Sequence, residues 1–159
     1  MTTLDDVIRV YGAGLARVAA SYEADRSLRQ DLVQDMLLAI HRALPGLRER
    51  DRLAAFVFRI AHNRCATHAL RERNARRVPQ ADEPADMGGD PERSALAQER
   101  HRRLLHAVRR LPLAYRQVVT LVLEELSHAE IAEALGLSVA NVAVRLNRAK
   151  AMLKEMLDG

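Results

Sequence analysis

Residues 127–150, SHAEIAEALGLSVANVAVRLNRAK, have the pattern of two short helices joined by a tight turn. Ser127 followed three residues later by Glu130 forms a capping box, in which each side chain accepts a hydrogen bond from a free backbone N–H group at a helix start. Gly136 suits the left-handed conformation that ends this helix, and Ser138 suits the cap of the next one. The stretch therefore predicts a helix-turn-helix unit, whose second helix can enter the major groove of DNA.

The second of these helices has two faces of opposite character. Apolar residues recur at helical spacing at Val142, Leu146, Ala149 and Leu153, which predicts that this side is buried. The other side holds the residues left for solvent or for DNA, namely Asn141, Val144, Arg145 and Arg148. Helix-turn-helix units also occur as packing modules, so the motif alone leaves a protein-interaction role open.

The middle of the chain changes character. Residues 78–92, VPQADEPADMGGDPE, contain three of the five prolines, two of the seven glycines and five acidic residues, with no basic residue. Prolines and glycines at this density oppose helix formation, so the segment is predicted to be a flexible acidic linker. The chain of 159 residues is then an all-α protein with two small helical domains, at 1–77 and 93–159.

Both predicted domains are basic. Residues 1–77 carry 14 Lys and Arg residues against 9 acidic ones, and residues 93–159 carry 11 against 7. Lys150 and Lys154 are the only lysines, and the guanidinium group of arginine matches phosphate oxygens and guanine edges. A genome rich in G and C would also favour arginine over lysine, but the positive charge of both domains suits a polyanionic partner.

Several classes of protein are disfavoured. No apolar run approaches the roughly 20 residues that span a bilayer, and the N-terminus, MTTLDDVIRV, lacks the pattern of a signal peptide. With its single cysteine, Cys65, the chain can form no internal disulfide, which fits a cytoplasmic protein without membrane insertion. No nucleotide-binding loop, nucleophile elbow or zinc-protease motif is present, so neither an enzyme with catalytic residues nor a cofactor is expected.

One pattern in the N-terminal half has metal-ligating residue types. His62, Cys65 and His68 recur at intervals of three residues on one predicted helix, so the outer two are nearly two turns apart. A zinc site needs a tighter arrangement and a fourth ligand or water. We interpret the set as a core thiol beside polar histidines and predict no metal site.

The N-terminal domain is predicted to contain three helices, at about residues 4–20, 25–44 and 53–77. In the second helix, Leu32, Met36 and Ile40 share an inward face. The opposite face is charged or polar, except that Leu38 interrupts it. An exposed leucine within a charged helical face is a candidate docking point for a partner.

Three stretches resemble conserved parts of bacterial RNA polymerase sigma factors. The segment at 31–47, DLVQDMLLAIHRALPGL, resembles the D-L-V-Q helix and L-P turn of sigma region 2, and FVFRIAHN at 56–63 resembles a further helix of that region. Residues 111–150, which include the helix-turn-helix, resemble sigma region 4. The order of the regions, the acidic linker and the short length resemble the extracytoplasmic-function (ECF) group, which keeps only these two domains.

The resemblance implies three binding surfaces. In this family one helix of region 2 docks on the clamp helices of the polymerase β′ subunit, and the matching residues here are Asp31, Leu32, Gln34, Asp35 and Leu38. Capture of a flipped base of the promoter −10 element is implied for the loop at 46–52, with Arg48, Arg50 and Arg52, and for Asn63. Reading of the −35 element is implied for Ser138, Val139, Ala140, Asn141, Val144, Arg145 and Arg148.

Departures from the family pattern leave alternatives open. Val139 and Val144 make the recognition face unusually apolar, and such side chains can contact thymine methyl groups or pack against another protein. Phe56 and Phe58 stand where the family often has tryptophan and tyrosine, and both are expected to pack in the core. The acidic linker could mimic nucleic acid in a basic polymerase channel, or it could be a plain tether.

The function implied is that of a sigma factor, which binds core RNA polymerase and directs promoter recognition and DNA opening, with an anti-sigma factor as a further partner. The alternative is a helix-turn-helix transcriptional activator whose N-terminal helices are a dimerisation or effector module. A third interpretation is an interaction protein that binds polymerase or a regulator without reading DNA. Tight binding of duplex DNA by the isolated protein would favour the activator, whereas specific binding only with core polymerase would favour the sigma factor.

Overall fold

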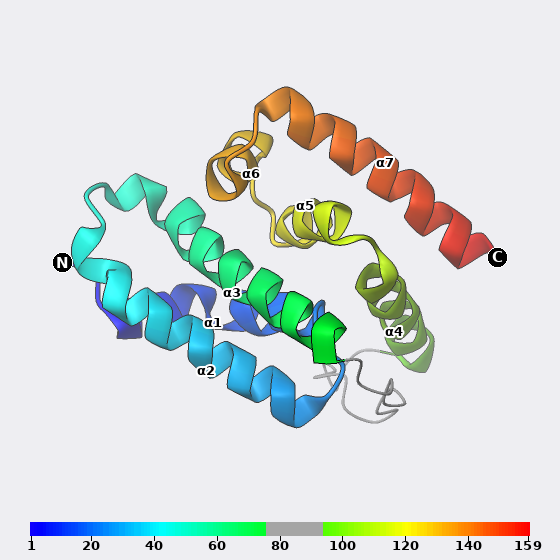
Figure 1. Ribbon diagram of the computed structural model, residues 1–159, viewed down its shortest axis with the longest axis horizontal. Coiled ribbons are helices and arrows are strands. Elements are labelled where there is room, and N and C mark those ends of the chain that lie inside the picture. The colour runs from blue at the N-terminus through cyan, green and yellow to red at the C-terminus, as the bar shows by residue number, and fades with distance from the viewer. Residues whose placement is uncertain (76–93) are drawn as a thin grey trace.

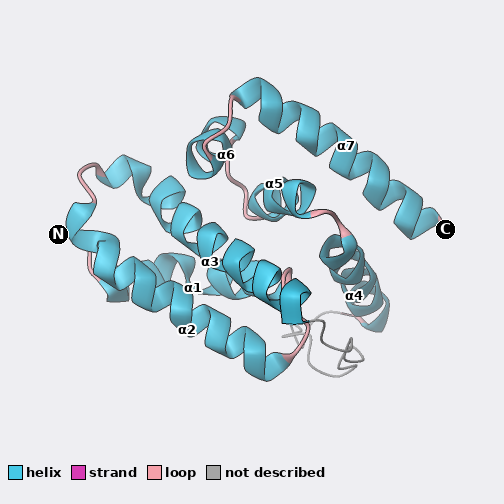
Figure 2. Ribbon diagram, in the orientation of Figure 1, coloured by secondary structure: helices cyan, strands magenta, loops and turns pink. Residues whose placement is uncertain are grey.

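The computed structural model describes residues 1–75 and 94–159, and within them every regular element is a helix (Figures 1 and 2). The elements are α1 (Leu4–Ala20), α2 (Arg26–Ala43), η1 (Leu44–Gly46), η2 (Arg50–Arg52), α3 (Leu53–Ala75), α4 (Ala95–Arg110), α5 (Leu113–Leu123), α6 (His128–Leu135) and α7 (Val139–Asp158). The all-α prediction is confirmed, and none of the described helices is long and apolar enough to cross a membrane. The linker predicted at 78–92 lies outside the described residues.

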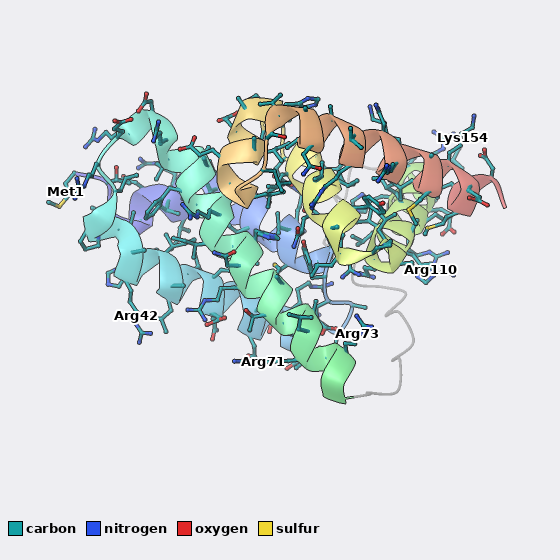
Figure 3. All side chains as sticks on the ribbon, turned by 45° about the horizontal axis from the view of Figure 1, so that its top comes forward. Met1, Arg42, Arg71, Arg73, Arg110 and Lys154 are labelled. Carbon is teal, nitrogen blue, oxygen red and sulfur yellow. The ribbon has the colours of Figure 1, made fainter. Side chains whose placement is uncertain are left out.

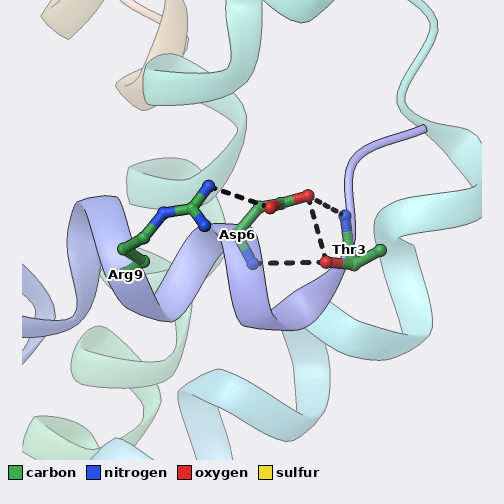
Figure 4. Close-up of polar contacts among 3 residues, drawn as sticks. All are labelled: Thr3, Asp6 and Arg9. Carbon is green, nitrogen blue, oxygen red and sulfur yellow. Dashed lines mark hydrogen bonds and ion pairs between the residues drawn. The ribbon is translucent and has the colours of Figure 1, made fainter.

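The first helix begins at a capping box that the sequence analysis did not single out. The Thr3 backbone N–H donates to the Asp6 carboxylate at 2.9 Å, and the Asp6 N–H donates to the Thr3 hydroxyl at 3.2 Å (Figure 4). The Thr3 hydroxyl also donates to the Asp6 carboxylate, at 3.0 Å, and the two hydrogen bonds that Thr3 donates lower the pKa of Asp6. Arg9, 3.0 Å away, acts in the same direction. A carboxylate held ionised at this position also interacts favourably with the positive end of the helix dipole.

The helix-turn-helix forms as its sequence predicts. The Ser127 hydroxyl accepts a hydrogen bond from the Glu130 N–H at 3.1 Å, and the Glu130 carboxylate accepts one from the Ser127 N–H at 2.8 Å. Gly136 ends α6 with φ at 69°, a conformation that costs an L side chain about 1–2 kcal/mol, and Ser138 caps α7. The inward face of α7 is confirmed by the burial of Val142, Leu146 and Ala149, and Leu153 is partly buried against the same core.

The three N-terminal helices pack around an apolar core. Leu15 of α1, Met36 and Ile40 of α2, and Val57 of α3 are fully buried, and burial of one such side chain stabilises the fold by roughly 1.5–3 kcal/mol. Phe58 is 2% exposed, as predicted, and contacts the ring of Tyr11 edge to face at 5.7 Å. Since α2 lies against both α1 and α3 through this core, its opposite side is left free for other contacts.

The N-terminal and C-terminal helices also pack against each other. Figure 1 shows α5 and α6 lying between α3 and α7, and the buried residues of both halves form one continuous apolar cluster. Helix α6, the first helix of the helix-turn-helix, lies directly against α3. The sequence analysis did not predict this contact, because α3 and α6 are separated by more than fifty residues of the chain.

The half-buried His62 of α3 links the free energy of unfolding to pH in a way that can be tested. Burial lowers the pKa of His62 to about 4, whereas a histidine in the unfolded chain titrates near pH 6.5. Between these values the unfolded chain binds a proton that the folded chain does not bind. The free energy of unfolding should therefore fall by about 2 kcal/mol as the pH is lowered from 7 to 5.

Urea unfolding of His62→Gln, followed by circular dichroism at both pH values, checks this expectation. The variant should lose most of the pH dependence of the unfolding free energy, because glutamine does not titrate. His41→Gln is the matched control, since His41 is exposed on α2. Equal pH dependence in His62→Gln and the unmodified protein would contradict the assignment.

Candidate nucleic-acid and protein interfaces

Helix α2 presents a continuous exposed face. Its residues recur at helical spacing and are all exposed: Asp31, Gln34, Asp35 and Leu38. The Leu38 side chain is 48% exposed and lies among the polar residues of this face. The Asp35 carboxylate lies 3.9 Å from Arg64 Nε with both side chains half exposed, so this loose pair leaves the carboxylate accessible.

Leu32 is the exception among the five residues predicted for this face. It is only 4% exposed and packs in the N-terminal core. The reason is its spacing, because Leu32, Met36 and Ile40 follow one another at intervals of four residues and share the inward side of α2. The prediction that Leu32 takes part in the docking face is therefore wrong, and its contribution is to hold α2 in place.

A cavity of about 280 Å³ lies where the loop at 46–52 meets α3 and α6. Among the residues that line it are Arg48, Arg52, Phe56, Arg59 and Glu133. An extruded base needs a pocket with stacking and hydrogen-bonding partners, and its flanking phosphates need cations. An aromatic ring with three guanidinium groups around it supplies these features, so this cavity is the candidate site for single-stranded nucleic acid.

Only some of the residues predicted to capture the flipped base line this cavity. Arg48 and Arg52 line the cavity, whereas Arg50 is exposed in η2 and does not line it. Asn63 is exposed on α3, one turn beyond Arg59 and two turns beyond Phe56, so the three residues follow one face of the helix away from the cavity.

The sequence analysis did not assign Phe56, Arg59 or Glu133 to this site. Phe56 was expected in the core, but it is only half-buried and lines the cavity as well as packing on the core. Arg59 was detectable, because it lies at helical spacing between Phe56 and Asn63. Glu133 could not be detected from the sequence, because it reaches the cavity from α6, in the other half of the chain.

Helix α7 exposes the face that was predicted to meet DNA. Val139 and Val144 are 50% and 47% exposed, and Ala140, Asn141 and Arg148 are exposed too. Arg145 is half-buried, and its Nε donates a hydrogen bond to Asn141 Oδ1 at 3.2 Å. The two side chains therefore form one polar unit on the helix surface.

Ser138 and the two lysines of α7 also bear on how this helix could contact DNA. The Ser138 hydroxyl accepts a hydrogen bond from the Asn141 N–H at 3.0 Å, so its oxygen is already used as the helix cap. Lys150 and Lys154 are both exposed on α7, and Figure 3 shows Lys154 pointing outward near the end of the helix. The cations of α7 thus continue along the helix beyond Arg148.

The cysteine and histidines of α3 lie in different surroundings. Cys65 is fully buried, and burial raises the pKa of its thiol. The His68 Nε2 lies 2.8 Å from the Glu23 carboxylate. Burial alone would raise the pKa of Glu23, but the hydrogen bonds from His68 and from the Asp25 N–H outweigh it and lower the pKa.

Within the described residues, one group has ligand atoms close enough to hold a metal ion. Glu23, His68 and Glu72 offer atoms that all lie within 4.8 Å of one another. This group is not the set of His62, Cys65 and His68 that the sequence analysis considered. In the sequence, only the four-residue spacing of His68 and Glu72 indicates that two of its members share a helix face. The hydrogen bond between Glu23 and His68 accounts for their proximity, so we assign the group a role in joining the α1–α2 turn to α3.

Both halves of the chain match known family models. Residues 7–75 match the model of sigma-70 region 2, and residues 101–153 match the model of sigma-70, region 4. RNA polymerase sigma factor NccH of Alcaligenes xylosoxydans xylosoxydans is 31% identical over 161 residues, which cover 96% of this chain and 85% of that protein. The ECF RNA polymerase sigma-E factor of Haemophilus influenzae is 27% identical over 141 residues, which cover 80% of this chain and 74% of that protein.

The fold also matches a solved complex. The structure of CnrH in complex with the cytosolic domain of CnrY aligns with a TM-score of 0.69 at 27% identity. The alignment covers 98% of this chain and 87% of that chain. The likeness therefore extends over both halves of the chain.

Proposed function

This chain belongs to the sigma-70 family of RNA polymerase sigma factors, in the ECF group. From that premise we propose which of its surfaces bind core polymerase and which bind promoter DNA during transcription initiation. The protein is a sigma factor, whose partners are core RNA polymerase and promoter DNA. The observation that carries this conclusion is the presence of region 2 and region 4 in one chain, in that order. Run-off transcription with purified core enzyme tests it directly.

The activator alternative is not favoured. It required the N-terminal helices to be a dimerisation or effector module, but residues 7–75 match sigma-70 region 2. The role proposed for the chain is binding rather than bond-making, so we assign it no catalytic residue. We place it in the cytoplasm, where RNA polymerase transcribes the chromosome.

The exposed face of α2 is proposed to bind the clamp helices of the β′ subunit. The support is an apolar centre, Leu38, beside the exposed carboxylates of Asp31 and Asp35. A leucine ringed by polar groups is the usual composition of a protein interface, with an apolar centre and a polar rim.

The cavity at 46–52 is proposed to capture a base of the −10 element. Arg48 and Arg52 would hold phosphates on either side of the base, and Phe56 offers a ring face. Asn63, exposed farther along α3, has a carboxamide that can both donate and accept at one base edge. Arg50 lies outside the cavity and is assigned to the phosphate backbone.

The exposed face of α7 is proposed to read the −35 element. The Asn141–Arg145 pair presents donors whose direction is fixed by their hydrogen bond, and Val139 and Val144 can contact thymine methyl groups. Ser138 acts mainly through the helix cap, which orients the first turn of α7.

An anti-sigma factor is proposed as a further partner. The support is the complex of CnrH with the cytosolic domain of CnrY, whose sigma chain matches this one along nearly its full length. An inhibitor of this kind would act by covering the exposed face of α2, because that face offers both an apolar centre and exposed carboxylates.

The double substitution Asp35→Arg with Leu38→Glu should abolish co-elution with core polymerase. It reverses one charge and removes the apolar centre, and both side chains lie outside the core, so the variant should fold. The matched control is Glu155→Arg with Ala151→Glu, which makes the same kinds of change on an exposed part of α7. Size-exclusion chromatography of a folded α2 variant that still co-elutes with core enzyme would refute the docking face.

The variant Asn63→Ala should change the base preference at one position of the −10 element. Arg50→Ala should instead reduce promoter opening on all sequences alike, because a phosphate contact carries no base information. Transcription from a promoter library randomised in the −10 element measures both effects. An unchanged sequence profile for Asn63→Ala would remove its assignment.

Replacing both Arg145 and Arg148 with alanine should lower transcription from promoters that depend on the −35 element, by about tenfold or more if one of them contacts a base. Core binding should be unchanged, because the substitutions lie far from α2. The matched control is Arg110→Ala with Lys154→Ala, which also removes two exposed cations from the C-terminal half (Figure 3). Full activity of the arginine variant would favour a protein contact for this face of α7.

A further inference from the structure

Three metal-ligating side chains meet where the α1–α2 turn lies against the end of α3. Glu23 comes from the turn, and His68 and Glu72 come from successive turns of α3, whose end lies beside the α1–α2 turn in Figure 1. One ligand atom of each residue lies within 4.8 Å of the other two. The four-residue spacing of His68 and Glu72 puts both on the helix face that meets the turn.

The three side chains are shielded from solvent more than the members of a usual surface ion pair. The side chains of His68 and Glu23 are 17% and 13% exposed, and Glu72 is also partly buried. Partial burial strengthens the attraction between a carboxylate and a cation, because less water screens the charges. These side chains are therefore better placed to hold an ion than fully exposed acidic residues would be.

The backbone of the turn orients the Glu23 carboxylate. Its Oε2 accepts a hydrogen bond from the Asp25 N–H at 2.9 Å, and its Oε1 lies 2.8 Å from His68 Nε2. Asp25 in turn caps α2 by accepting a hydrogen bond from the Leu28 N–H at 3.0 Å. Carboxylates that bind metal ions are normally held by an outer hydrogen bond of this kind. One oxygen of Glu23 is thus fixed by the turn, and the other is directed at α3.

The distances and the charge suit a small divalent ion. Metal–ligand bonds of about 2.0–2.2 Å place neighbouring ligand atoms about 3–3.5 Å apart. The distance between Glu23 Oε1 and His68 Nε2, 2.8 Å, is close to this range, and rotation of the side chains can bring Glu72 into it. Two carboxylates and a neutral imidazole together carry the charge that a divalent cation balances. The ion would replace the hydrogen bond between Glu23 and His68.

We propose that Glu23, His68 and Glu72 bind a divalent transition-metal ion of the Zn²⁺ class, which joins the α1–α2 turn to the end of α3. One nitrogen and two oxygen ligands suit Zn²⁺ better than Mg²⁺ or Ca²⁺, which prefer oxygen ligands alone. Three protein ligands leave a position for water. The sequence analysis predicted no metal site, because the turn that supplies Glu23 is distant in sequence from the end of α3.

The proposed metal site is separate from the cavity assigned to the −10 element, and it does not depend on that assignment. Phe56 and His68 are both on α3, and their positions in the helix put them about 18 Å apart along its axis. A bound ion would therefore stabilise region 2 by linking two of its elements, without occupying the cavity.

The test uses the full chain without an affinity tag, freed of metal by a chelator, and the probe is Zn²⁺ alone at about pH 7.5, where imidazole is neutral. Isothermal titration calorimetry should show one Zn²⁺ ion bound per chain. With Zn²⁺ at roughly 100 times the dissociation constant, the midpoint of thermal unfolding should rise by about 5–10 °C. Mg²⁺ and Ca²⁺ at the same concentration should not raise it.

Two variants separate metal binding from hydrogen bonding. His68→Gln and Glu72→Gln keep a group that forms hydrogen bonds, but a neutral amide is a poor ligand for Zn²⁺. Each should weaken Zn²⁺ binding at least about tenfold, since loss of even an outer partner of a ligand typically costs that much. The matched controls are His41→Gln and Glu155→Gln, which make the same changes at exposed positions and should bind Zn²⁺ as the unmodified chain does.

Co²⁺ in place of Zn²⁺ reports which side chains bind the ion. Its visible absorption bands should appear when it binds the unmodified chain and should be lost in His68→Gln. The variant Glu72→His supplies a second imidazole on the same helix face, so it should bind Zn²⁺ about tenfold more tightly or better and shift the Co²⁺ bands. A near-ultraviolet band from a thiolate bound to Co²⁺ would instead identify Cys65 as a ligand.

Three outcomes would overturn the proposal. The first is Zn²⁺ binding by the unmodified chain that is no tighter than that of folded His68→Gln, and the second is equal binding by Glu72→Gln and the unmodified chain. The third is the thiolate band. Glu72→Gln leaves the hydrogen bond between Glu23 and His68 in place, so it tests the site even if His68→Gln does not fold.

Co-elution with core polymerase reports separately on the proposed function. Glu72→Gln should retain co-elution while it loses tight Zn²⁺ binding, because it lies outside the α2 docking face. The variant Asp35→Arg with Leu38→Glu should show the reverse, with Zn²⁺ binding kept and co-elution lost. Failure of one proposal is therefore distinguishable from failure of the other.

Discussion

A carboxylate that is almost fully removed from water needs its hydrogen bonds, and Glu124 obtains two of them from Arg17 of α1. This requirement fixes the end of α5, and with it the turn that leads into the helix-turn-helix. The glutamate that follows, Glu125, has φ at 66°, a left-handed conformation that a non-glycine residue adopts at a cost of about 1–2 kcal/mol. Local backbone hydrogen bonds close this turn, from the Glu125 N–H to the Val122 carbonyl oxygen at 2.9 Å and from the Leu126 N–H to the Leu121 carbonyl oxygen at 3.2 Å.

The local features of the fold were predictable because they depend on residues close in sequence. The capping box at Ser127, the left-handed Gly136 and the burial of Val142 follow from spacing within one helix or turn. The exposed position of Leu38 followed in the same way from the polar residues around it. Each of these predictions needed only helical periodicity and the conformational preference of one residue.

Features that depend on distant residues were not predictable from the single sequence. Arg17 and Glu124 are 107 positions apart, and no periodicity connects them. Glu133 reaches a cavity whose other residues come from the region 2 half, so no pattern in the sequence groups it with them. Leu32 shows a different limit, because a family pattern assigned it to the docking face although its own spacing placed it in the core.

The two lysines of the chain have a practical consequence. Lys150 and Lys154 are both exposed, and both lie on α7. Chemistry directed at side-chain amines, such as acetyl transfer or coupling of an activated ester dye, therefore acts on this helix alone, apart from the N-terminal amine. Acetylation would remove positive charge only from the helix assigned to the −35 element. A fluorophore coupled in this way would report on that helix in the unmodified sequence.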